Sequence, residues 1–423
     1  MYAAIASCWA LLLGIGLMML GNGLQGSLLA LRATLEGFST EVTGIVMSGY
    51  FIGFLGGSTL APRIVKRVGH IRVFAALASL ASAAALLHVV FIDAAAWMAI
   101  RVITGFSYAG LYVVAESWLN ARSTNETRGQ LLSVYMVVML GGMAGGQLLL
   151  NVADPEGFAL FILVSVLVSI ALVPIALTPT VAPDFDTAAP VGLVELYRIS
   201  PLGVVGCMVI GIAHGGFFAM GAVYGEKLGL SLAGISILMG LFMVGGVLLQ
   251  WPIGRLSDRF DRRAVLTIAA FLAAAAAVAA LMTSATGGLP FFAAIGILGG
   301  MSLPIYSLCL AHTNDYLEPG QVVGASSALV LVTGIGAILG PLTTAVAMSA
   351  VGPGGFLGTI AAVHVGIGVF ALYRMTRRPA VPFEDKVPHV DIAPRATPVA
   401  AAWAAQTVHA QAAENAEDAG DEN

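Results

Sequence analysis

The sequence predicts an all-α membrane protein with twelve transmembrane helices arranged as two pseudo-symmetric six-helix bundles. Three observations predict this fold class. Of the 423 residues, 58% are hydrophobic and only 10% are charged. The apolar residues fall into twelve long runs, and the second half of the chain repeats features of the first. Because soluble proteins contain about 25% charged residues, the composition excludes an ordinary soluble domain.

Each apolar run has about 20 residues, which is the length that an α-helix needs to cross a bilayer. Residues 1–179 are expected to form an N-terminal bundle, 180–200 a linker and 201–376 a C-terminal bundle. The acidic, Ala- and Pro-rich tail, 377–423, is expected to be disordered. The expected spans are residues 4–30, 41–63, 71–91, 94–120, 129–152, 156–178, 202–226, 231–254, 264–283, 289–313, 321–347 and 353–375.

The basic residues separate the loops into two kinds. The loops after the second, fourth and eighth spans and the start of the tail hold several Arg and Lys, and the linker holds Arg198, whereas the alternate loops hold only Arg32 and Lys227. By the positive-inside rule, both termini and the linker are expected to be cytoplasmic. The expected location is the inner (plasma) membrane of the cell.

The two halves repeat at an offset of about 192–195 residues. Met47, Tyr50 and Gly53 match Met239, Phe242 and Gly245, and three further glycines have partners at the same spacing. Six spans, an even number, keep the two repeats parallel. We therefore expect a pseudo-two-fold axis along the membrane normal and a solute site between the bundles. Close packing or hinging is expected at Gly105, Gly145, Gly300, Gly340 and Pro341.

One face of the helix predicted over 94–120 is polar. Arg101, Gly105, Tyr108, Tyr112 and Glu116 fall within an arc of roughly 80° and form a stripe about 22 Å long. A charge in the middle of a membrane helix costs about 2.5–3.5 kcal/mol on insertion scales. The stripe is therefore expected to face a protein interior or a wet cavity.

Residues 254–263 resemble the G-x-x-x-D-R-x-G-R-R loop signature of the major facilitator superfamily, with Asp261 in place of the usual Gly. The first-half copy is more degenerate, with Pro62 at the first Gly and Lys66 at the Asp. Arg101-x-x-x-Gly105 resembles the fourth-helix motif, and Gly340-Pro341 resembles the Gly-Pro motif. Residues 113–117, 128–136 and 250–256 are similar to the YcaD-type branch. The resemblance covers about residues 1–376 and implies a transporter that works by alternating access.

Arg101 and Glu116 each have two interpretations. Arg101 could bind an anionic solute or favour ionisation of a neighbouring carboxyl, or it could be structural and cap backbone carbonyls. The superfamily resemblance implies a proton-linked role for it. Glu116 could carry the coupling proton, or it could act as a gate by pairing with Lys66, Arg67 or Arg72.

Two further sets of polar residues are candidates. Asp258 with Arg255, Arg259 and Arg262 is expected to form a cytoplasmic gate that holds in one arrangement of the bundles and breaks in the other. The alternative is that these charges only set the topology. The cavity is also expected to include Asn22, Gln25, Gln147, His214 and Tyr306, unless these groups only join helices by hydrogen bonds.

The sequence shows no catalytic signature and no phosphate-binding loop, and the three cysteines lie far apart in apolar runs. We therefore expect no enzyme activity, metal, cofactor or nucleic-acid partner. The predicted function is secondary active transport of a small organic solute, amphipathic or anionic, coupled to protons. The protein is expected to be a monomer in the lipid bilayer. The alternatives are a non-transporting sensor or scaffold and, less simply, a membrane-embedded enzyme.

Overall fold

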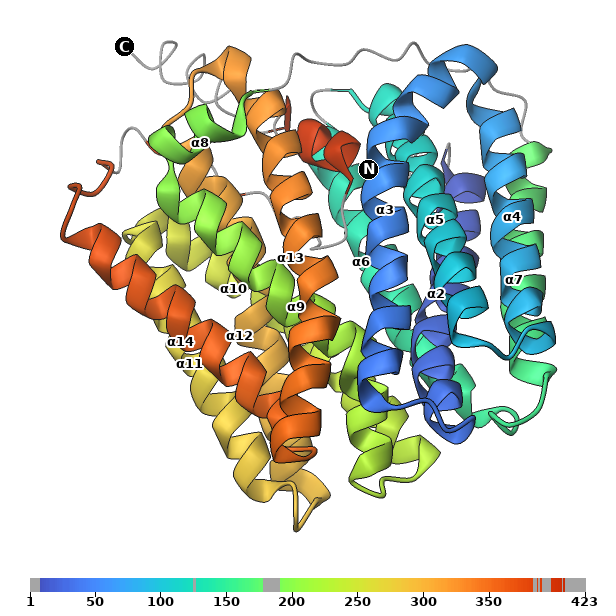
Figure 1. The fold of residues 1–423 in the computed structure, drawn as a ribbon. Helices are drawn as coiled ribbons and strands as arrows, with labels where there is room; N and C mark the ends of the chain where they lie inside the picture. Colours follow the sequence, from blue (N-terminus) through green and yellow to red (C-terminus); the bar gives the residue numbers. More distant parts are fainter. Residues whose placement is uncertain are drawn as a thin grey trace.

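The computed structural model describes residues 8–124, 127–177, 191–382, 386, 389, 397–404 and 406–407, and this part of the chain is helical throughout its regular structure (Figure 1). Twelve of its helices are long and apolar enough to cross a membrane, which confirms the predicted fold class. They are α2 (Trp9–Leu35), α3 (Thr40–Val68), α4 (His70–Val90), α5 (Ala94–Arg122), α6 (Arg128–Leu148), α7 (Ala159–Ala176), α9 (Pro201–Lys227), α10 (Leu232–Arg259), α11 (Arg262–Thr283), α12 (Gly288–Asn314), α13 (Val322–Val351) and α14 (Gly355–Met375).

Three short helices lie between the long ones. The 3₁₀ turn η1 (Leu149–Asn151) continues α6, and η2 (Pro319–Gln321) precedes α13. Helix α8 (Leu193–Ile199) lies within the predicted linker, of which residues 180–190 fall outside the described residues.

Side-chain caps fix where several of the long helices begin. Ser39 accepts a hydrogen bond from the backbone N–H of Val42 at the start of α3, and Asp93 accepts one from Ala96 at the start of α5. Ser231 caps α10 in the same way. Each cap satisfies a backbone donor that the helix itself leaves unpaired. Short loops then connect helices that must run antiparallel.

The helices form two groups that lie side by side in Figure 1, α2–α7 on one side and α9–α14 on the other. Within the first group α3 packs along α5 and α2 along α6. Within the second, α10 packs along α12 and α9 along α13. Helix α3 also packs against α13, so these two helices form a principal seam between the bundles.

Glycines let the corresponding helix pairs approach closely in both bundles. A Cβ at Gly53 would overlap the carbonyl oxygen of Val102, so α3 and α5 meet backbone to backbone there. In the second bundle, a Cβ at Gly245 would overlap the carbonyl oxygen of Gly296 between α10 and α12. Such small-residue contacts are a common basis of helix association in membranes.

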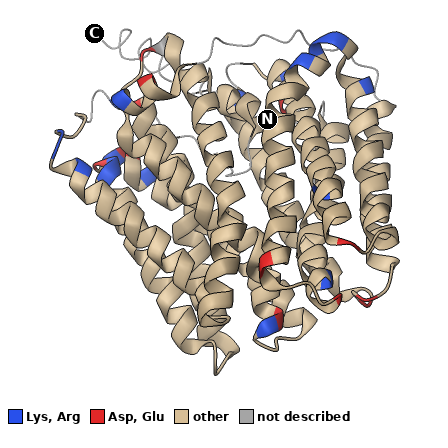
Figure 2. Ribbon diagram, viewed as in Figure 1, with Lys and Arg blue, Asp and Glu red and all other residues tan. Residues whose placement is uncertain are grey.

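The two ends of the molecule differ in charge. Figure 2 shows most of the Lys and Arg at one end, which we call the basic end. At the opposite end the bundles are joined by a hydrogen bond of 2.8 Å from the Asn151 amide to the Ser236 hydroxyl. Gly44 of α3 also packs there against the carbonyl of Pro341 and the side chain of Ala345 in α13.

Most of the tail that is expected to be disordered, 377–423, lies outside the described residues, but its described part includes a helix. Residues 398–404 form a short helix, drawn in red at the basic end in Figure 1, and the side chain of Trp403 is fully buried. The segment is a run of Ala and Val around one Trp, so it has good helix formers and an apolar face to bury. The composition of the whole tail hides this short apolar segment, because the acidic and polar residues of the tail outnumber the apolar residues of the segment.

We expect Gly245→Ala to lower the free energy of unfolding in detergent by about 1–3 kcal/mol, because the added methyl group overpacks the α10–α12 contact. The matched control is Gly240→Ala in the same helix, where a Cβ would meet nothing within 4 Å. Thermal unfolding of the two variants measures the difference. Equal melting temperatures would show that the backbone contact is not close.

Candidate functional site

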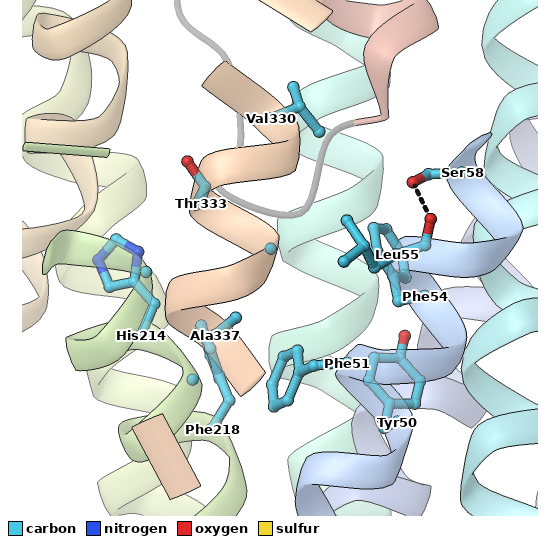
Figure 3. A pocket seen from close by; sticks show the side chains of 13 residues that line it. Tyr50, Phe51, Phe54, Leu55, Ser58, His214, Phe218, Val330, Thr333 and Ala337 are labelled. Carbon is cyan, nitrogen blue, oxygen red and sulfur yellow. Dashed lines mark hydrogen bonds between the residues drawn. The ribbon is translucent and has the colours of Figure 1, made fainter. Parts of the chain in front are cut away.

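A pocket lies between the two bundles and is lined by α3 on one side and by α9 and α13 on the other. The space open to the centre of a water-sized sphere is about 40 Å³, below the volume of typical small-molecule sites, so the pocket is narrow in this conformation. Its walls are mostly aromatic and aliphatic, and Figure 3 shows Tyr50 and Phe51 facing Phe218 and Ala337 across it. The lining residues are Tyr50, Phe51, Phe54, Leu55, Ser58, Gly211, His214, Gly215, Phe218, Val330, Thr333, Gly334 and Ala337.

The polar groups on the pocket wall present mainly acceptor atoms. Ser58 donates its hydroxyl proton to the carbonyl of Leu55 at 3.0 Å, and Thr333 donates its own to the carbonyl of Leu329 at 2.9 Å. Each hydroxyl oxygen keeps its lone pairs. A solute in this pocket would therefore be recognised by its N–H or O–H groups.

His214 is the predicted cavity residue that lines this pocket, and a polar chain lies behind it. His364 Nδ1 is 2.8 Å from the carbonyl of Ile360, which can only accept, so this nitrogen carries a proton. In the neutral ring Nε2 is then an acceptor, and it receives the hydroxyl proton of Ser302 at 2.8 Å. Ser302 in turn accepts from His214 Nε2 at 3.1 Å. This order makes Nδ1 the acceptor nitrogen of a neutral His214.

The Arg101 end of the predicted polar stripe packs within the first bundle, around Tyr50. The guanidinium of Arg101 is buried and lies 4.7 Å from the centre of the Tyr50 ring. Asn22 donates to the hydroxyls of Tyr50 at 3.2 Å and Tyr112 at 2.6 Å. The Tyr108 ring packs against both tyrosines. The Tyr50 ring that lines the pocket therefore also contacts the Arg101 guanidinium, which is not itself among the lining residues.

Glu116, at the other end of the stripe, is completely buried near the basic end. Its carboxylate accepts a hydrogen bond of 2.7 Å from the Tyr135 hydroxyl of α6. It also accepts hydrogen bonds from the Thr397 hydroxyl and, at 3.2 Å, from the Ala400 backbone N–H, both in the tail. No ion pair among the described residues involves Glu116, and Lys66, Arg67 and Arg72 are exposed.

The remaining predicted cavity residues are buried in different surroundings. Gln147 accepts from the Ser27 hydroxyl at 2.5 Å and donates to the Gly23 carbonyl at 2.9 Å, so it joins α6 to α2. The amide of Gln25 and the hydroxyl of Tyr306 have no hydrogen-bond partner within the described part of the chain. Buried polar atoms of this kind suggest a place for water or solute.

The predicted hinge glycines pack closely against neighbouring helices. A Cβ at Gly105 would overlap the carbonyl of Tyr50, and one at Gly340 would overlap the carbonyl of Ile212. Gly300 faces Leu249 and Gly145 faces Leu20, and Pro341 lies inside α13. The packing role is visible, and hinge motion stays a prediction.

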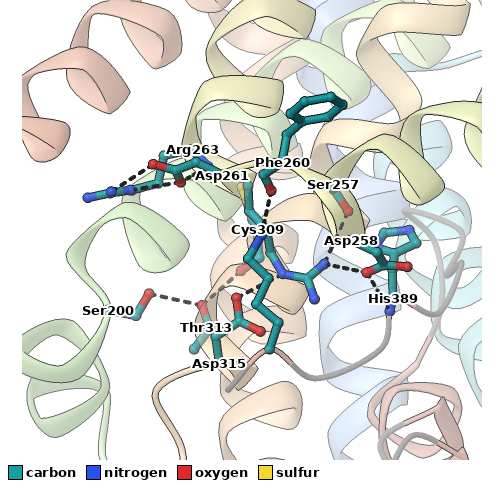
Figure 4. Close-up of polar contacts among 12 residues, drawn as sticks. Ser200, Ser257, Asp258, Phe260, Asp261, Arg263, Cys309, Thr313, Asp315 and His389 are labelled. Atoms are coloured by element: carbon teal, nitrogen blue, oxygen red, sulfur yellow. Dashed lines mark hydrogen bonds and ion pairs between the residues drawn. The ribbon is translucent and has the colours of Figure 1, made fainter. Parts of the chain in front are cut away.

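Of the other predicted gate residues in the described part of the chain, Asp258 is the one shown to pair with Arg262, and Figure 4 shows Asp258 together with Asp315. The Arg262 guanidinium pairs with Asp258 at 3.2 Å and with Asp315 at 2.8 Å, so it ties α10, α11 and α12 together. Arg255 instead stacks over the Trp251 ring at 4.0 Å, and Arg259 is exposed. These contacts lie within the second bundle.

Asp261, which replaces the usual Gly of the loop signature, caps α11. Its carboxylate accepts from the backbone N–H of Arg263 at 3.0 Å and pairs with the guanidinium of the same residue at 2.7 Å. Burial opposes its charge, but the hydrogen bonds from Arg263 prevail and hold the pKa of Asp261 below its usual range. Its φ of −55° makes no demand for glycine.

Several site residues were not predicted. Tyr50 is matched in the repeat, but nothing in the sequence marks it as the centre of a polar cluster. His364 could have been found, since a lone His in an apolar span is itself a functional signal. Thr397 and Trp403 lie in a segment with no membrane character. Among the described residues, no three His, Cys, Asp or Glu side chains are grouped so that they could hold a metal.

Two groups of six membrane-length helices with a pocket between them are the architecture of a multi-pass membrane protein. A family model described as Major Facilitator Superfamily matches residues 11–234 and 204–410. The chain is 33% identical over 342 residues, 80% of its length and 88% of the relative, to the uncharacterized MFS-type transporter YcaD of Escherichia coli. The chain belongs to the major facilitator superfamily, in the YcaD-like branch.

Solved structures agree on the fold. A point mutant of the nucleoside transporter NupG superposes with a TM-score of 0.73 at 11% identity, covering 87% of this chain and 99% of that one. A bacterial homologue of the human lysosomal transporter Spinster, in an inward-facing and occupied conformation, superposes with a TM-score of 0.67 at 15% identity. That match covers 91% of this chain and 98% of the homologue.

We expect Asp261→Ala to lower the free energy of unfolding in detergent by about 2–3 kcal/mol, because the α11 cap is lost and the Arg263 guanidinium loses its charged partner. Asp261→Asn keeps an acceptor for the cap and is expected to cost less. The contribution of the carboxylate is present at neutral pH and is lost as pH falls through its lowered folded-state pKa. Equal melting temperatures for both variants and the parent at pH 7 would contradict this role.

Proposed function

We propose that the protein is a secondary active transporter that moves a small organic solute across the bacterial inner membrane by alternating access, coupled to protons. The observation that carries the proposal is the pocket whose walls come from both bundles. A rocking motion of one bundle against the other would open such a pocket to one side of the membrane at a time.

The contacts at the two ends of the molecule support a conformation that is closed toward the outside. The bundles are joined at the opposite end, through Asn151 with Ser236 and through Gly44 with Pro341. By the positive-inside rule the basic end is cytoplasmic. The described conformation would then be closed toward the outside, with its basic, cytoplasmic end occupied by the tail segment.

The pocket chemistry favours an amphipathic solute with an aromatic or aliphatic body and one or two N–H or O–H groups. The aromatic walls provide the apolar contact, and the oxygens of Ser58 and Thr333 provide acceptors. A heavily hydroxylated sugar would leave many of its polar groups unpaired in such a pocket. Because Arg101 is not among the residues that line the pocket, a direct contact of its guanidinium with an anionic solute is less well supported.

Glu116 is the candidate for the coupling proton. It is a fully buried carboxylate whose three donors are neutral, and Lys66, Arg67 and Arg72 are exposed. These surroundings support the proton-carrier interpretation over a gate made of ion pairs. Arg101 would act more remotely, by holding the Tyr50 ring at the pocket wall.

The function is tested with purified protein in liposomes carrying an imposed pH gradient and an internal pH-sensitive dye. The probes are small aromatic amines, aromatic alcohols and, for contrast, hexose sugars. We expect proton movement that depends on one of the aromatic probes and is absent with the sugars. No solute-dependent proton movement with any probe would favour a non-transporting sensor or scaffold.

Glu116→Gln is expected to reduce solute-dependent proton movement at least tenfold, since the amide cannot release a proton at any working pH. The matched control is Asp93→Asn in the same helix, an exposed position where asparagine still caps α5. The control should retain the parent activity. A Glu116→Gln variant with full, pH-dependent activity would refute the proton-carrier role.

A further inference from the structure

The tail segment at the basic end is packed as tightly as the helix cores. Thr397, Ala400, Ala401, Trp403 and Ala404 are each at most 2% exposed. Along the same short helix, Ala402 is only partly buried and Gln406 is exposed. This alternation means that one face of the segment is seated on the protein and the other is open.

The first bundle holds the segment through Glu116. Two of the three hydrogen bonds to its carboxylate come from the tail, from the Thr397 hydroxyl and from the Ala400 backbone N–H. The third comes from Tyr135 of α6. A buried carboxylate that loses donors pays a large desolvation cost, so Glu116 strongly favours the seated segment.

An aromatic contact anchors the same segment. The Trp403 ring is fully buried, and its centre lies 6.1 Å from that of the Tyr135 ring. Farther along, the Asn120 amide of α5 donates to the Gln406 side chain at 3.2 Å. A buried Trp beside polar contacts is the usual composition of a binding hot spot.

The second bundle contacts an earlier part of the tail. The backbone N–H of His389 donates to the Asp258 carboxylate at 3.0 Å, and the Lys386 ammonium donates to the Phe260 carbonyl at 2.6 Å (Figure 4). Gly254 leaves room for the His389 ring, which a Cβ at that position would meet at 2.5 Å. The loop signature of the second bundle thus supplies contacts to the tail as well as to its own helices.

We infer that the basic end of the protein contains a peptide-binding site, formed by α5 and α6, whose ligand is the described tail segment of the same chain, residues 397–404 with 406 and 407. Because Lys386 and His389 contact the second bundle, the tail touches both bundles, and it would hinder closure of this end and cover a route from it to the pocket. Transport would require the segment to leave. The binding site stands on the contacts alone, and the regulatory consequence rests on the proposed transport function.

The binding site is tested by cysteine labelling in a background in which Cys8, Cys207 and Cys309 are replaced by serine. Ala401→Cys and Ala402→Cys are compared in inside-out vesicles with a membrane-impermeant maleimide. We expect the thiol of Ala401→Cys to react at least tenfold more slowly than that of Ala402→Cys, because its reaction waits for the segment to leave. Equal rates at the two positions would overturn the site.

The block is tested with a second label in the pocket, Ser58→Cys, at a position that is 2% exposed. Trp403→Ala, which removes the anchor, is expected to raise the labelling rate of the Ser58→Cys thiol about tenfold. Trp403→Phe keeps an aromatic ring and should leave that rate nearly unchanged. Adding a synthetic peptide of residues 397–407 to the Trp403→Ala variant should restore protection.

An unchanged labelling rate in the pocket of the Trp403→Ala variant would overturn the block, even if the tail is seated. Neither labelling readout depends on a transported solute. Failure of the inference is therefore distinguishable from failure of the proposed function, which is measured by proton movement in liposomes.

Discussion

The structure depends on the requirement that every charged group buried among membrane helices be met by donors or by an aromatic face. Unpaired, such groups would cost several kcal/mol each in hydrocarbon. Arg101 is met by the ring of Tyr50, and Glu116 by donors from α6 and from the tail. The Arg101–Tyr50 contact connects the polar stripe of α5 to the pocket wall. The contacts of Glu116 connect the stripe to the basic end.

The two bundles have the same arrangement of helices but different buried polar residues. Close glycine contacts recur at matching places, Gly53 in α3 and Gly245 in α10. The first bundle carries buried Arg101 and Glu116, and the second carries the histidine chain through Ser302 and, at the basic end, the buried Arg262–Asp315 pair. The pocket lies where these unlike halves meet. An asymmetric distribution of titratable groups over a symmetric scaffold is suited to linking a proton to a solute.

The spans, their number and the repeat could be predicted from the sequence because hydropathy and spacing are local properties. Boundaries were less well predicted where polar residues continue a helix, as in α2, which extends to Leu35 because Arg32 pairs with Glu36 at 2.5 Å. The contact between the Arg101 guanidinium and the pocket-lining Tyr50 ring could not be predicted, since it depends on the packing of α3 against α5. The seating of Trp403 depends likewise on contacts between the tail and helices that are distant in the sequence.

The central claim is that the bundles exchange between two arrangements around the pocket and that the charge on Glu116 biases the exchange. Electron spin resonance distances in liposomes test it most directly, with label pairs at Ala121 and Leu256 for the basic end and at Leu35 and Ala233 for the opposite end. The account predicts that Glu116→Gln, which mimics the protonated carboxyl, shortens the first distance and lengthens the second. Identical distances in the parent and in Glu116→Gln would contradict it.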